Sequence, residues 1–238
     1  MGNNAVKQHL DTAEKTGALQ LCKQGLKEFP EHLLKLSKNL RTLDFSDNKI
    51  DHIPSNIGAF QQLKTVNLSN NRIDSLPNEI GNLKKLESLN LENNILTSLP
   101  PTLINLSHLR TINLSRNGFK KFPVELCQLK QLDGIDLSRN KITEIPATAA
   151  VCHTIELNLN QNQISTLPDC ISDWPRLKVL RLEENCLEIS ALTPRIMKES
   201  KIALLAVEGN VFDMKAFNHV EGYDQYMERY TATKKKFN

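Results

Sequence analysis

Apolar and polar residues follow one short pattern that recurs along most of the chain. The block LRTLDFSDNKI begins at Leu40, and close copies begin at Leu63, Leu86, Leu109 and Leu132, so the repeat length is 23 residues. Three further copies and a degenerate first copy, LQLCKQGL, complete a series of nine. The recurring asparagines are Asn48, Asn71, Asn94, Asn117, Asn140, Asn162, Asn185 and Asn210. Such a series predicts a solenoid, because one unit alone buries too little apolar surface.

Each position of the repeat has a structural task. Leu43 and Phe45 alternate as in a strand, so both side chains point to the same side, toward the core. The asparagine can bond backbone groups of a tight turn and of the neighbouring coil. A proline usually follows six residues later and ends strand pairing, because it lacks an N–H and fixes φ. These prolines are Pro54, Pro77, Pro100, Pro123, Pro146 and Pro168. We therefore predict an α/β solenoid of about nine turns with a concave parallel β-sheet.

The two ends of a solenoid expose apolar surface and need caps. Residues 4–15 have the pattern of an amphipathic helix with Leu10 and Ala13 on one face, and Gly17 is placed to end it. At the other end, Asp213 is placed to N-cap a segment rich in aromatic residues, followed by the basic tail TATKKKFN. We predict three regions: an N-terminal segment and capping helix at 1–17, repeats at 18–212, and a C-terminal cap and basic tail at 213–238.

Composition narrows the class of protein. The longest apolar run, residues 202–207, is too short to span a bilayer, and charged residues interrupt the first stretch, which argues against secretion. The five cysteines form no C-x-x-C pair, so we expect reduced thiols in the cytosol. A net charge of +3 gives no case for nucleic-acid binding.

The sequence offers no catalytic or metal-binding pattern. The motifs G-x-S-x-G and H-E-x-x-H, a P-loop and a Gly-rich nucleotide fingerprint are all missing. The six histidines stand singly, without metal-ligand spacing. We therefore expect no enzyme activity, no cofactor and no metal, and a monomer that binds a protein partner.

The leucine-proline step resembles the intracellular leucine-rich repeat class that is related to Ras-binding and Ras-suppressor proteins. From Ile155 onward, segments such as IELNLNQNQIS, LLAVEGNVF and EGYDQYMERYTATKKKF closely resemble one animal subfamily of these proteins. The resemblance implies a horseshoe with helical caps and a role in protein binding. It also suggests a small GTPase as partner, although a fold does not fix a function. A small GTPase or a ubiquitin-ligase component would be bound through the concave face if the protein were an untethered adaptor.

The concave face is the surface on which we expect a partner. It is formed by strand residues that point away from the core, and its side chains are mostly short and polar. Arginines are favoured in binding hot spots. The candidate contacts are Asp44, Asn67, Asn90, Asn113, Arg116, Asp136, Arg139, Asn158, Arg181 and Glu183. The alternative is that the Ser, Thr and Asn side chains, which recur at equivalent positions of successive strands, only keep the concave sheet hydrated and soluble.

Arg116 and Arg139 occupy equivalent positions of adjacent repeats. Adjacent strands lie about 5 Å apart, so the two guanidinium groups should repel one another unless an anion or a carboxylate bridges them. We expect the pair to contact an acidic partner.

The chain begins MGNNAVK, which places glycine behind the initiator methionine. The N-myristoylation signal is M-G-x-x-x-[ST], and Val6 stands where Ser or Thr is expected. Val6 fits the core side of the capping helix instead. The subfamily resemblance implies Met-Gly-Asn with Gly2 as the acylated residue. We therefore expect a scaffold tethered through Gly2 to the cytoplasmic face of membranes and also present in the cytosol; the alternative is an untethered soluble adaptor.

One myristoyl chain binds membranes only marginally, with an association constant of about 10⁴ M⁻¹, so a second signal is wanted. Lys234, Lys235 and Lys236 are candidates for contact with an anionic leaflet. A solvated tail is the plainer interpretation of this run.

Overall fold

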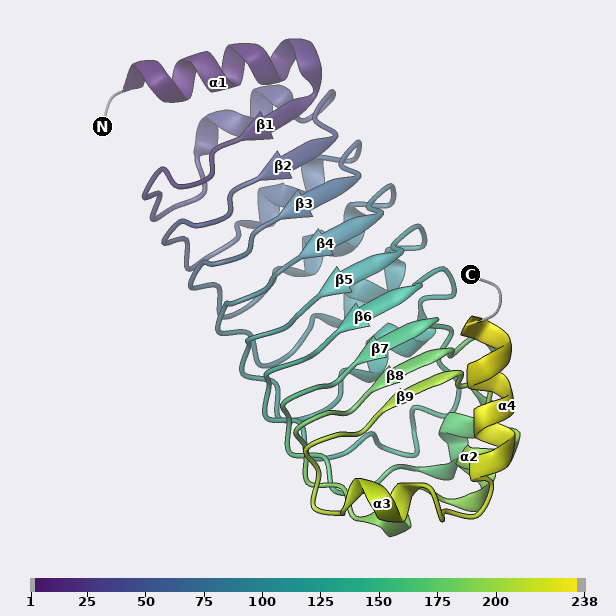
Figure 1. The fold of residues 1–238 in the computed structure, drawn as a ribbon. Helices are drawn as coiled ribbons and strands as arrows, with labels where there is room; N and C mark the ends of the chain where they lie inside the picture. Colours follow the sequence, from purple (N-terminus) through teal and green to yellow (C-terminus); the bar gives the residue numbers. More distant parts are fainter. Residues whose placement is uncertain (1–2, 235–238) are drawn as a thin grey trace. The chain divides into compact units, whose positions relative to one another are not determined.

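The structure is a computed structural model that describes residues 3–234. The chain divides into two compact units, an N-terminal unit that ends at Gly118 and a C-terminal unit that begins at Phe119. Each unit is a stack of coils with strands on one side and short helical segments on the other (Figure 1). The described part has nine parallel strands of three residues each, which confirms the predicted solenoid.

The N-terminal unit starts with the helix α1 (Asn3–Thr16), which leads into the first strand. Its strands pair in chain order and in register, so that residues at equivalent places of the repeat are neighbours. The strands are β1 (Ala18–Gln20), β2 (Thr42–Asp44), β3 (Thr65–Asn67), β4 (Ser88–Asn90) and β5 (Thr111–Asn113).

The C-terminal unit repeats this arrangement and ends in helices. Its strands β6, β7, β8 and β9 pair in chain order. The elements are β6 (Gly134–Asp136), β7 (Glu156–Asn158), β8 (Val179–Arg181), α2 (Pro194–Glu199), β9 (Leu204–Ala206), α3 (Met214–Phe217) and α4 (Tyr223–Lys234).

Short 3₁₀ helices form most of the return segments. Most of them begin directly after a repeat proline whose φ lies near −70°, as at Pro54 and Pro77, so these prolines end the extended segment as predicted. The segments are η1 (Glu31–Leu36), η2 (Ser55–Ala59), η3 (Asn78–Asn82), η4 (Pro101–Asn105), η5 (Val124–Gln128), η6 (Asp169–Asp173) and η7 (Ile189–Ala191).

The recurring asparagine joins neighbouring coils, as the sequence predicts. The amide nitrogen of Asn71 donates to Phe45 O in the preceding coil at 2.9 Å and to Leu68 O in its own coil at 3.0 Å. Its Oδ1 accepts from Ile50 N at 3.0 Å. Because the side chain is buried, this one residue satisfies backbone groups that water cannot reach.

Leucine, isoleucine and phenylalanine side chains fill the space between the strands and the return segments; Leu43, Phe45 and Ile50 are at most 1% exposed. One return segment is irregular: Pro146 is followed by turns and not by a 3₁₀ helix. The indole of Trp174, which is 1% exposed, donates to Ala149 O at 2.9 Å and satisfies that irregular backbone. The sequence analysis did not assign Trp174 this task, because the carbonyl it meets lies a whole coil away.

The N-terminal helix ends as the sequence predicts. Gly17 has φ +72° and donates its N–H to Ala13 O at 2.8 Å, which closes the last turn of α1. A Cβ at this position would lie 2.9 Å from Asn39 O, so the site needs glycine for two reasons.

The C-terminal helices cover the last coil. Asp213 caps α3 by accepting from Lys215 N at 2.9 Å, as predicted. The hydroxyl of Tyr226 in α4 accepts from Leu205 N of β9 at 3.1 Å, and Arg229 donates to Ile202 O at 2.9 Å. These bonds satisfy backbone groups of the last coil, which has no following coil to bond with.

The basic tail begins later than the sequence analysis expects. Residues 231–234 are helical and belong to α4, and Lys234 Nζ lies 4.8 Å from the centre of the Tyr230 ring. A cation over an aromatic face is attracted to it, which favours one more helical turn. Lys235 and Lys236 lie outside the described residues. Within residues 3–234, no helix has the length and apolar character needed to cross a membrane.

Candidate functional site

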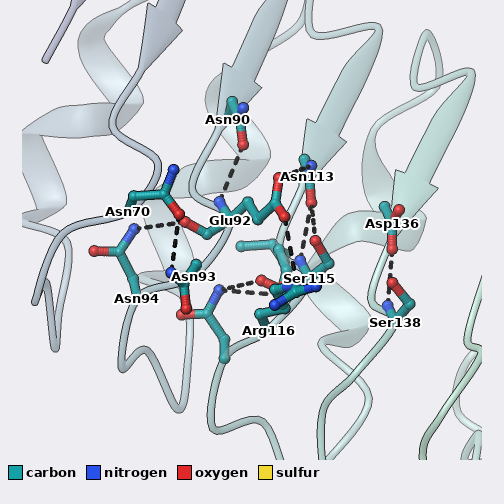
Figure 2. A network of polar contacts seen from close by, with 12 residues as sticks. Asn70, Asn90, Glu92, Asn93, Asn94, Asn113, Ser115, Arg116, Asp136 and Ser138 are labelled. Carbon is teal, nitrogen blue, oxygen red and sulfur yellow. Dashed lines mark hydrogen bonds and ion pairs between the residues drawn. The ribbon is translucent and has the colours of Figure 1, made fainter. Parts of the chain in front are cut away.

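Six of the predicted contact residues close the ends of their own strands. Each stands four positions before a recurring asparagine and accepts a hydrogen bond from the backbone N–H two residues later, at 2.8–3.2 Å. Figure 2 shows this contact for Asn90, Asn113 and Asp136. This is the Asx turn that Asn and Asp side chains form readily. The six residues are Asp44, Asn67, Asn90, Asn113, Asp136 and Asn158, and all are half-buried. One oxygen of each is therefore used inside the protein.

Sequence reasoning missed this turn, although its signal is present: Asn or Asp recurs two positions before a turn residue in six successive repeats. The remaining polar atoms connect neighbouring coils. Asn113 Nδ2 lies 3.5 Å from Glu92 Oε2, and Asn158 Nδ2 donates to Asp136 Oδ2 at 3.2 Å. These six residues therefore help to hold the surface together, and they are also candidates for contact with a partner.

The residue before each recurring asparagine, and Lys23 before Gln24 in the degenerate first repeat, has a left-handed backbone. φ lies between +53° and +58° at eight non-glycine positions, which L-residues other than Asn and Asp adopt reluctantly. These positions are Lys23, Asp47, Asn70, Asn93, Arg116, Arg139, Gln161 and Glu184. Because the conformation recurs in every regular repeat, it belongs to the turn and marks no individual site.

Some of these left-handed residues bond to one another across coils. Asn70 Nδ2 donates to Asp47 Oδ1 at 3.0 Å, and Asn93 Nδ2 donates to Asn70 Oδ1 at 2.9 Å. The result in the N-terminal unit is an exposed row of amide groups at the end of the strand face (Figure 2).

Arg116 ends this row in the N-terminal unit. Its Nε lies 3.6 Å from Glu92 Oε1, and the two side chains are 49% and 37% exposed (Figure 2). An exposed ion pair contributes roughly 0–1 kcal/mol, so the guanidinium can exchange this carboxylate for another at little cost. Arg139 belongs to the C-terminal unit, and the predicted closeness of the two arginines stays a prediction.

The C-terminal unit holds a second exposed network. Both Nε and Nη2 of Arg181 lie 3.0 Å from Glu156 Oε1. Glu183 accepts from Asn160 Nδ2 at 2.5 Å, and its backbone N–H donates to Asn160 Oδ1 at 2.9 Å. Glu184 accepts from Gln161 at 2.9 Å. Carboxylates outnumber the single arginine here, so this end of the strand face is acidic.

The cysteines and the candidate metal ligands of the described residues complete the chemistry of the site. Cys127 and Cys152 are both buried and in contact; this contact and burial raise the pKa of the Cys127 thiol, whereas the same contact lowers the pKa of Cys152. Burial also raises the pKa of Cys170. Among the residues that the structure describes, no group of three His, Cys, Asp or Glu side chains is placed to hold a metal ion.

Solved structures of other repeat proteins share this fold. A leucine-rich repeat protein of Leptospira interrogans is 27% identical, with 89% of this chain and 67% of that chain covered and a TM-score of 0.64. Internalin C2 of Listeria monocytogenes is 20% identical over 86% of this chain and 91% of that chain, with a TM-score of 0.69. A Shigella effector repeat domain is 23% identical over 88% and 90%, with a TM-score of 0.64. The last two show the fold alone.

Family models agree with these structures. The model described as "Leucine rich repeat" matches residues 61–119, 84–142 and 130–187, which together cover more than half of the chain. A model for two copies of the repeat matches residues 38–78. Proteins with this repeat typically bind other proteins and are usually non-catalytic. The chain belongs to the leucine-rich repeat family.

Proposed function

We propose that this protein is a non-catalytic interaction scaffold that is held at the cytoplasmic face of membranes by a myristoyl group on Gly2. The observation that supports a binding role is the exposed charge at the strand ends of a fixed frame. Asx turns and the buried asparagines hold the backbone, while the Arg116–Glu92 and Arg181–Glu156 pairs stay exposed. A surface already ordered loses little entropy on binding.

The partner that suits this surface carries charges of both signs. Arg116 in the N-terminal unit favours a carboxylate, whereas the acidic network around Arg181 in the C-terminal unit favours basic side chains. Charge complementarity of this kind orients a partner and raises the association rate more than it raises affinity. The partner is a protein, and it contacts the ends of the strands.

Charge reversal tests the surface. Arg116→Glu with Arg139→Glu should lower recovery of partners in quantitative affinity purification from cells. Lys49→Glu with Arg72→Glu is the matched control, because these two exposed side chains undergo the same change of charge and lie outside the predicted set of contact residues. Partners recovered equally by both variants would contradict the assignment of the surface.

The tether rests on the sequence, because Gly2 lies outside the described residues. A Met-Gly-Asn start and the subfamily resemblance support it, and Val6 in place of Ser or Thr departs from the motif. The test is the intact mass of the protein isolated from cells, compared with Gly2→Ala, together with fractionation of both forms. An unmodified N-terminus with partner binding intact would favour the untethered adaptor.

A further inference from the structure

The end of α1 forms one wall of a polar pocket of about 330 Å³ in the N-terminal unit. The opposite wall comes from the loop before β2, and Gln62 from the loop before β3 completes it. Liquid water occupies about 30 Å³ per molecule, so the space fits a small polar headgroup and not just one or two waters. We call it the α1-end pocket; its charged and amide side chains are Glu14, Lys15, Lys38, Asn39, Arg41 and Gln62.

The charge of the α1-end pocket is unbalanced. Lys15, Lys38 and Arg41 bring three positive charges against the single carboxylate of Glu14, and all four side chains are exposed. Among the side chains that the structure describes, no carboxylate lies within 4.0 Å of any of these three cations. The cations are therefore available to a ligand.

At the equivalent position of the next coil, the cation is paired with a carboxylate. Lys64 stands where Arg41 stands one coil earlier, and its Nζ lies 2.8 Å from Glu87 Oε1. That contact lowers the pKa of Glu87, as expected for a carboxylate beside a cation. Arg41 has no such carboxylate among the described side chains. The excess of positive charge is therefore found at the pocket and does not recur at the equivalent position of the next repeat.

The amides of the pocket add hydrogen-bond donors. Gln62 Oε1 accepts from Lys85 Nζ at 2.6 Å, which leaves the amide nitrogen of Gln62 as its free donor. Asn39 supplies a second side-chain amide. The backbone N–H of Arg41 already donates to Gly17 O at 2.7 Å, so Arg41 offers a ligand its side chain alone.

A purely structural role explains only part of this arrangement. Lys15 lies in the last turn of α1, where a cation complements the helix carbonyls. That argument does not reach Lys38 and Arg41, which stand outside the helix. Guanidinium and ammonium groups around a small polar space are the usual recognition chemistry of phosphate.

We propose that the α1-end pocket binds a phosphomonoester, and that the phosphorylated headgroup of an inositol phospholipid provides it at the membrane. This inference rests on the proposed tether for its biological use. A 14-residue helix is about 21 Å long, and Gly2 precedes α1 in the chain while the pocket lies at its other end. The lipid chain and the headgroup site thus belong to one unit, and the pocket supplies the second signal that a single myristoyl chain needs.

Unlipidated protein tests the pocket independently of the tether. Flotation compares phosphatidylcholine vesicles with vesicles that also hold phosphatidylinositol bisphosphate, or phosphatidylserine at equal charge, and NMR titration with inositol trisphosphate provides the soluble arm. A cation near an anionic surface changes affinity about 5-fold, so Lys38→Gln with Arg41→Gln should weaken binding to bisphosphate vesicles about 25-fold. Lys49→Gln with Arg72→Gln removes the same charge elsewhere in the unit and should leave binding unchanged.

The outcomes separate the two sources and the two proposals. Loss in the pocket variant alone, with binding to bisphosphate vesicles above that to phosphatidylserine vesicles, supports the headgroup site. Binding of inositol trisphosphate without vesicle binding supports the phosphate site and overturns the headgroup as its source. Equal vesicle binding by both variants, or no response to either phosphate, overturns the inference. An intact mass without a myristoyl adduct would remove the tether but would not change these results.

Discussion

Replacing Asn71 by alanine should destabilise the N-terminal unit far more than any exposed substitution nearby. The side chain is buried and accepts from Ile50 N at 3.0 Å. It donates to Phe45 O, Leu68 O and Ser69 O at 2.9, 3.0 and 3.1 Å. Alanine removes all four contacts in one step.

The cost depends on which backbone groups keep another partner. The three carbonyls each retain one, namely Asn48 Nδ2 for Phe45 O, Asn94 Nδ2 for Leu68 O and Asp47 N for Ser69 O. The N–H of Ile50 retains none, and that residue is 0% exposed. One orphaned buried donor costs about 1–3 kcal/mol, and the two N–H groups of the lost amide each give up a hydrogen bond worth about 1 kcal/mol, so the total is roughly 3–5 kcal/mol.

Urea unfolding followed by circular dichroism measures the change in unfolding free energy. Arg72→Ala, on the exposed next residue, is the control and should change it by less than about 0.5 kcal/mol. The amide of Ile50 should also exchange with deuterium much faster in the Asn71→Ala variant. A loss of stability below about 1 kcal/mol, or unchanged exchange at Ile50, would refute this account of the asparagine.

Three further substitutions test separate features. Lys23→Asn should raise stability by about 0.5–1 kcal/mol in thermal unfolding, because Lys23 is exposed with φ +58° and asparagine tolerates that backbone better. Trp174→Phe should cost about 2–3 kcal/mol in urea unfolding, since it empties space in the core and removes the hydrogen bond to Ala149 O; a cost below 1 kcal/mol would contradict the bridging role. Burial raises the pKa of Tyr226, so its protonated form adds stability that is fully present below the ordinary value of 10.0 and is lost as pH rises through the folded value. Absorbance titration should place this tyrosine above 10.0, and Tyr226→Phe should abolish its part of the alkaline loss of stability.

The repeat frame and its ends could be predicted because their signals are local. The strand alternation around Leu43, the proline at position 54 and the glycine at position 17 each act within one coil or one turn. The binding surface could not be predicted to the same degree. The sequence predicts Asn90 and Asn113 as partner contacts. In the structure, each side chain accepts a hydrogen bond from the backbone N–H two residues later, at the end of its own strand.

The sequence by itself determined the number and length of the coils, the strand direction, the buried positions and the need for caps. These follow from periodicity, since each residue type meets the same local geometry in every repeat. Only the tertiary structure decided which polar atoms are already used. It paired Arg116 with Glu92, set Trp174 against the irregular segment, and gathered Lys15, Lys38 and Arg41 around one pocket. Those relations join side chains of different coils, and their distances depend on how the coils stack and not on spacing along the chain.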